Sequence, residues 1–104
     1  MLFIETPIFT SEIQSLLPDE YYRNLQGDLS IRPDAGNIIT GSGGLRKIRF
    51  GLKGIGKRGG LRIIYYWDPP DTIYMLFACK KNEQEDLTKS QIKILSKLVQ
   101  EYLK

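Results

Sequence analysis

Two alternating strands joined by a glycine-rich link constrain the fold of this chain more than any other feature of its sequence. In LRKIRF, a period of two places Ile48 and Phe50 on one face and Lys47 and Arg49 on the other. In LRIIYYW, the same period places Arg62 on one face of the strand and the apolar residues on the other face. That face consists of Leu61, Ile63, Tyr65 and Trp67. The pattern predicts a twisted antiparallel hairpin with one positive face.

The charge of this hairpin has one sign. No acidic residue occurs between Asp34 and Asp68, and the link GLKGIGKRGG combines five glycines with three cations. The cations of the segment are Arg46, Lys47, Arg49, Lys53, Lys57, Arg58 and Arg62. Such clustering indicates a polyanionic partner, of which nucleic-acid phosphate is the commonest. A merely solvated strand face is the alternative interpretation.

Composition restricts the class of protein further. A length of 104 residues predicts a single domain spanning 1–104, with a net charge of +3. The single cysteine, Cys79, excludes an intramolecular disulfide and favours a cytoplasmic location. The absence of histidine excludes histidine-based metal sites and Ser-His-Asp triads. We expect no signal peptide, because Glu5 interrupts the apolar start, and no membrane span.

The flanking segments predict three helices and two more strands. We expect strands at Leu2–Glu5 and Thr72–Lys81, helices from Pro7 to about Leu17, from Pro18 to just before Pro33 and from Thr88 to Tyr102, and a loop over 34–44. Thr88 and Gln91 fit a capping box, and Leu87 with Ile92 fits a hydrophobic staple. The apolar stripe of the last helix is Ile92, Leu95, Leu98, Val99, Tyr102 and Leu103. The predicted class is α+β, a mostly antiparallel twisted sheet with two N-terminal helices and one C-terminal helix.

The predicted strand Thr72–Lys81 also ends in two cations, Lys80 and Lys81. If the three strands are neighbours, these lysines, together with Lys47, Arg49 and Arg62, lie around one concave face. Such a group of cations can bind a phosphodiester and neutralise a pentacoordinate transition state. We expect three side chains to pack inside, namely Tyr65, Trp67 and the thiol of Cys79. For Tyr66, the sequence does not distinguish a core position from an exposed one that stacks on a base.

Three blocks of the sequence resemble a known family. They are GLRKIR at 44–49, GKRGGLRIIYYW at 56–67 and KNEQEDLT at 81–88. On these residues the chain resembles the RelE/HigB superfamily of bacterial toxins, and within it the HigB type. The resemblance implies a RelE-like fold and a ribosome-dependent, metal-independent endoribonuclease without a cofactor, which cleaves mRNA in the ribosomal A site. It also implies a cytoplasmic type II toxin that stops translation and is neutralised by a cognate antitoxin, expected to be of the helix-turn-helix type.

The resemblance also assigns site residues. The catalytic cations of the family match Lys47, Arg49, Arg62 and Lys81, with Lys80 beside the last, while RNA-binding cations are expected at Arg46, Lys53, Lys57 and Arg58. At one position the chain departs from RelE. Leu87 stands where RelE has a tyrosine that contributes to the chemistry. Because leucine cannot transfer a proton, that role is vacant or has moved to another residue.

In the family reaction, the ribose 2′-OH attacks the adjacent phosphate and leaves a cyclic phosphate and a 5′-OH. Without histidine, a lysine among other cations is the best candidate base, and we assign this role to Lys47. Arg62 is the expected phosphate clamp, since its planar fork suits two oxygens. Arg49 and Lys81 would stabilise charge, and either Lys80 or Lys81 is a candidate acid.

Two other functions use the same basic face. A non-catalytic RNA-binding module needs the same cations, and so does an interaction protein that docks an acidic partner. Antitoxin binding also has two possible modes. An acidic segment would cover the cationic face. Alternatively, a segment would fold onto the paired helices of residues 7–32, where Tyr21 and Ile31 are candidate apolar contacts.

Overall fold

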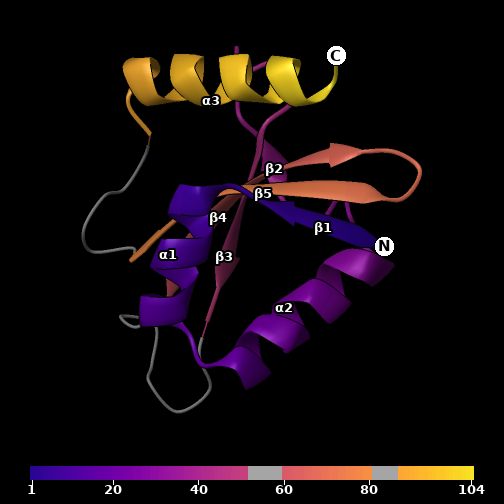
Figure 1. Ribbon diagram of the computed structural model, residues 1–104, viewed down its shortest axis with the longest axis vertical. Helices are drawn as coiled ribbons and strands as arrows, with labels where there is room; N and C mark the ends of the chain where they lie inside the picture. Colours follow the sequence, from indigo (N-terminus) through magenta and orange to yellow (C-terminus); the bar gives the residue numbers. More distant parts are fainter. Residues whose placement is uncertain (52–59, 81–86) are drawn as a thin grey trace.

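The computed structural model describes residues 1–51, 60–80 and 87–104, and these form an α+β domain (Figure 1). Its elements are, in order, β1 (Leu2–Glu5), α1 (Pro7–Leu16), α2 (Asp19–Ile31), β2 (Asn37–Ile38), β3 (Arg46–Phe50), β4 (Leu61–Asp68), β5 (Thr72–Lys80) and α3 (Lys89–Tyr102). The predicted class and the order of the main elements are therefore confirmed.

The sheet has five strands in the order β1-β5-β4-β3-β2. The three longest strands form an antiparallel meander, as the sequence predicts, and β1 pairs with β5 in parallel. The interpretation of 34–44 as a loop without regular structure is wrong at two residues. Asn37 pairs with Lys47 and Ile38 with Arg46, so a short edge strand extends the sheet beyond β3.

Helix α1 completes the edge of β5. Strand β1 pairs with β5 only as far as Met75, which would leave without partners the later backbone groups of β5 that point away from β4. The Thr6 hydroxyl donates to the Leu76 carbonyl at 3.0 Å, and a Glu12 carboxylate oxygen accepts from the Ala78 amide at 3.3 Å. The N-cap residue of α1 and a side chain within the helix therefore satisfy backbone groups that a longer β1 would otherwise pair.

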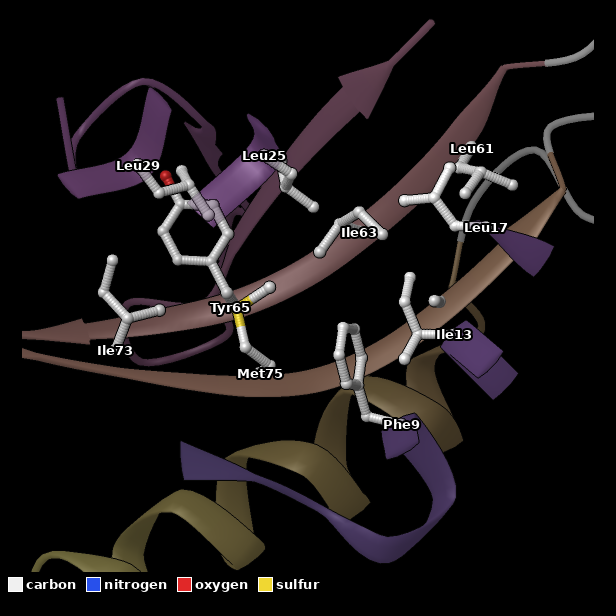
Figure 2. Close-up of a cluster of buried hydrophobic side chains, with 11 residues drawn as sticks. Phe9, Ile13, Leu17, Leu25, Leu29, Leu61, Ile63, Tyr65, Ile73 and Met75 are labelled. Atoms are coloured by element: carbon white, nitrogen blue, oxygen red, sulfur yellow. The ribbon is translucent and has the colours of Figure 1, made fainter. Parts of the chain in front are cut away.

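The first core lies between the sheet and helices α1 and α2 (Figure 2). Ile63 and Tyr65 point from β4 toward Phe9 of α1 and Leu25 and Leu29 of α2. Ile48, Phe50 and Trp67 are partly buried against the same cluster. The alternation in β3 and β4 thus places the predicted apolar residues toward the paired helices.

The second core lies on the other face of the sheet, under α3. Figure 1 shows α3 on the opposite side of the sheet from α2. Leu95 and Val99 of α3 pack with Leu45 and Leu76. The ring of Tyr102 stacks on the ring of Tyr74, with the ring centroids 5.2 Å apart. The predicted apolar stripe of α3 is too wide. Leu98 is only half-buried and belongs to neither cluster, and Leu103 is exposed.

The predicted caps of α1 and α3 are confirmed, and α2 begins at Asp19, one residue after the predicted Pro18. Thr6 caps α1 by accepting from the Phe9 amide at 3.0 Å, with Pro7 in the first turn. Thr88 and Gln91 form the reciprocal capping box at the start of α3. Each cap satisfies amide groups that the first helical turn leaves without a partner.

A small polar network ties β1 to both N-terminal helices. The Glu5 carboxylate accepts a hydrogen bond from Thr10 of α1 at 2.6 Å and another from the Tyr22 hydroxyl of α2. Burial, and then the hydrogen bond to Glu5, raise the pKa of the Tyr22 hydroxyl well above its ordinary value. Tyr22 is therefore a neutral donor that connects α2 to the sheet.

No helix in the described part of the chain is long and apolar enough to cross a membrane.

Candidate nucleic-acid interface

Three of the predicted cations lie together on the α3 side of the sheet. Arg49 of β3 is directly opposite Arg62 of β4, and Lys47 is opposite Ile64. Directly opposed residues of antiparallel strands project to the same face. Ile64 packs in the core under α3, so this is the face that α3 covers in part. The hairpin register therefore assembles Lys47, Arg49 and Arg62 into one cluster, which we call the cationic cluster.

Two adjoining depressions surround the cationic cluster. The first, the polar hollow, has a volume of about 450 Å³ and is lined by Ala35, Asn37, Lys47, Ile48, Arg49 and Arg62. The second, the apolar pocket, has a volume of about 320 Å³ and is lined by Ile38, Ile39, Thr40, Lys47, Arg62, Ile64, Phe77, Cys79, Leu87 and Ile92. Lys47 and Arg62 line both, so they stand where the two depressions meet.

The electrostatics of this region follow from its lining. None of the described residues around the two depressions is acidic, whereas three are cationic. An anion at the junction would meet Lys47 and Arg62 together, with Arg49 on the polar side. A phosphate held there would have an apolar cavity next to it, which is a suitable environment for a nucleobase or ribose.

The remaining predicted catalytic lysines are placed less favourably or lie outside the described residues. Lys80 is exposed and pairs with Leu61, whose side chain lies in the core under α1 and α2. Lys80 therefore leaves the strand on the face opposite to Arg62, at the end of β5. Lys81, Lys53, Lys57 and Arg58 all lie outside the described residues.

Arg46, predicted to bind RNA, has a structural contact on the other face of the hairpin. It pairs with Tyr65 of the first core. Its guanidinium donates to the carbonyl of Gly36 at 2.8 Å and to that of Asp34 at 3.2 Å. These bonds hold the backbone just before β2 against the sheet, which positions Asn37 beside the polar hollow.

The three consecutive aromatic residues of β4 differ in burial. Tyr65 is fully buried, as predicted, and burial raises the pKa of its hydroxyl. Trp67 is half-buried against the first core. Tyr66 is half-buried on the α3 side, where a β-carbon at Gly44 would approach its ring to 3.1 Å. None of the three lines a depression beside the cationic cluster.

Cys79, which is expected to pack inside, is half-buried. It lies directly opposite Arg62 and lines the apolar pocket, on the part of this face of the sheet that α3 leaves uncovered. The thiol is thus part of the cavity wall next to the cationic cluster.

Residues 37–40 contribute to this site, although the sequence did not predict it. Asn37 lines the polar hollow, and Ile38, Ile39 and Thr40 line the apolar pocket. The available signal was the pair of isoleucines inside an otherwise polar, glycine-rich segment. Leu87 lines the apolar pocket together with Ile92. As predicted for a leucine, it contributes a hydrophobic wall and no group that can transfer a proton.

No protein-family model matches the chain.

Proposed function

We propose that this chain is the toxin of a type II toxin–antitoxin system, a ribosome-dependent endoribonuclease that cleaves mRNA in the A site and stops translation. One observation carries the proposal. Three cations from two neighbouring strands face the same depression, and the described part of its lining holds no acid. The resemblance of residues 44–49, 56–67 and 81–88 to the RelE/HigB superfamily supports the same function.

In the proposed reaction, Lys47 accepts the proton of the ribose 2′-OH. The 2′-oxygen then attacks the adjacent phosphorus, and the bond from phosphorus to the 5′-oxygen breaks. Arg62 clamps two phosphate oxygens through its planar fork, and Arg49 neutralises the charge that develops on them. An acid protonates the departing 5′-oxygen, which yields a 2′,3′-cyclic phosphate and a 5′-OH.

Lys80 projects to the opposite face of the sheet and is therefore poorly placed to be the acid. The other candidate acid is Lys81, which lies outside the described residues. The ribosome contributes by aligning the mRNA for in-line attack, so that a few protein groups suffice.

The test measures mRNA cleavage on programmed ribosomes for Lys47→Ala and Arg62→Ala. We expect each variant to lose a factor of about 10² or more in rate, as for the loss of one transition-state donor. Arg23→Ala is the matched control, since Arg23 is an exposed cation on α2, across the sheet. Its rate should equal that of the wild-type protein, and all three variants should melt like the parent.

The outcome also separates the enzyme from a non-catalytic RNA-binding module. Growth arrest on expression, with cyclic-phosphate ends on the cleaved mRNA, supports the nuclease. Wild-type protein that binds ribosomes and RNA but generates no cleaved ends would overturn the nuclease assignment and favour the binding module.

A further inference from the structure

A second row of cations lies on α3, outside the cationic cluster. Lys89, Lys93 and Lys97 are spaced at i, i+4 and i+8, so they form a stripe along one side of the helix. All three are exposed, while Leu95 and Val99 on the other side of the helix are buried. The stripe spans about 12 Å along the helix axis.

This stripe borders a groove rather than a flat surface. The groove, here called the lysine groove, has a volume of about 540 Å³ and is lined by Thr40, Gly41, Lys89, Ile92, Lys93, Ser96, Lys97 and Gln100. Its second wall is the turn before β3. The Ser96 hydroxyl donates a hydrogen bond to the Ser42 carbonyl, and Ser42 is buried. This bond holds the turn against α3.

The lysine groove continues into the apolar pocket. Thr40 and Ile92 line both, just as Lys47 and Arg62 line both the apolar pocket and the polar hollow. The three depressions therefore form one track. It has cations at each end and an apolar section between them.

The three lysines of the stripe carry like charges at neighbouring positions of one helix. Lysines four residues apart repel each other and destabilise a helix. Within the described residues, no acidic side chain forms an ion pair with Lys89, Lys93 or Lys97. A polyanion lying in the track would remove this repulsion.

We propose that the lysine groove binds the backbone of the same RNA strand whose phosphate lies between Lys47 and Arg62. The inference rests on the proposed function, because the continuity of the track with the cationic cluster identifies the occupant as the mRNA strand. A single strand fits such a track, since its phosphates meet the cations at both ends and its bases meet the apolar section. The lysines bind and position the strand and take no part in the chemistry.

The experiment compares binding of short and long RNA by fluorescence anisotropy. The probes are single-stranded 2′-O-methyl RNA oligonucleotides of about 4 and about 12 nucleotides, which this reaction cannot cleave because the attacking hydroxyl is blocked. For Lys89→Gln/Lys93→Gln/Lys97→Gln, we expect affinity for the long probe to fall about tenfold and affinity for the short probe to stay unchanged. The slope of log K against log salt should also decrease by about 2, as for three lost phosphate contacts.

The control variant is Arg23→Gln/Arg32→Gln/Lys104→Gln, which removes the same charge from exposed positions outside the track. It should bind both probes like the wild-type protein. Equal losses for the two triple variants, or no loss for the lysine variant, would overturn the proposal.

A second measurement separates mRNA from ribosomal RNA. Ribosomes without mRNA should bind the wild-type protein and the lysine variant equally. Weaker binding of the lysine variant would mean that the groove contacts ribosomal RNA, which contradicts the proposal. If the lysine variant loses affinity for the long probe but the wild-type protein cleaves no mRNA, the RNA track stands and the proposed nuclease activity fails.

Discussion

The single residue Tyr65 connects the first core to the segment that leads into β2. Its ring is buried, and its hydroxyl donates to the Pro33 carbonyl and accepts from the Gly36 amide, both at 2.8 Å. A β-carbon at Gly36 would approach this hydroxyl to 2.8 Å, so only glycine fits there. Tyr65 and Arg46 together hold the segment that leads into β2.

We predict that Tyr65→Phe destabilises the fold by about 1–3 kcal/mol, because the buried Gly36 amide would lose its partner. Urea denaturation of wild-type protein and variant measures the difference. Tyr102→Phe is the control. Its ring stacks on Tyr74, its hydroxyl donates to no group among the described residues, and its stability should change by less than about 0.5 kcal/mol. Equal stability of Tyr65→Phe and wild type would contradict the role of the hydroxyl.

The helix α3 has two sides with different surroundings. One side packs Leu95 and Val99 on the sheet, and the other presents the lysine stripe to the groove. The capping box at Thr88 fixes where the helix begins and hence which residues point to each side. The sequence alone places Leu98 within the packed stripe, but the structure leaves it half-buried between the two sides.

Val99→Asp tests this packing. We expect a loss of about 3 kcal/mol or more, because Val99 is 1% exposed and a carboxylate there would be buried without a partner. Ile94→Asp on the same helix should change stability by less than about 0.5 kcal/mol, since Ile94 is 66% exposed. Thermal denaturation compares the two variants. If both melt at the same temperature, α3 does not pack on the sheet as described.

At the scale of the whole molecule, the two faces of the sheet are covered differently. Helices α1 and α2 cover one face with a large core, whereas α3 covers only part of the other and leaves the track beside it. The outer surface of α2 is a separate surface, and Ile31 there is 83% exposed. Tyr21, which the sequence suggested as an exposed contact, is instead half-buried against the first core.

If the proposed function holds, we propose that a cognate antitoxin binds this helical surface and leaves the cationic cluster uncovered. The test measures binding of the protein encoded beside this chain to two variants. Lys47→Ala/Arg49→Ala/Arg62→Ala should retain the wild-type affinity within about threefold, whereas Ile31→Asp should lose about tenfold or more. Collapse of binding in the triple variant would mean that the antitoxin covers the cationic cluster directly.

Features that depend on local geometry could be predicted from the sequence. Strand alternation separates Lys47 and Arg49 from Ile48 and Phe50 because the side-chain period of a strand is two. The caps at Thr6 and Thr88 follow from residues at most three positions apart. The cationic cluster was predictable too, because a short hairpin brings neighbouring segments of the chain together.

Features that depend on contacts between distant segments could not be predicted from the sequence. The register of β4 with β5 turns Lys80 away from Arg62, and one residue of slip would have reversed that face. Arg46 became a structural residue because its guanidinium reaches carbonyls 10 and 12 residues away. The track itself exists because α3 returns over the sheet beside the turn at Thr40. No local pattern encodes such a contact, since its free energy comes from packing segments that are far apart in the chain.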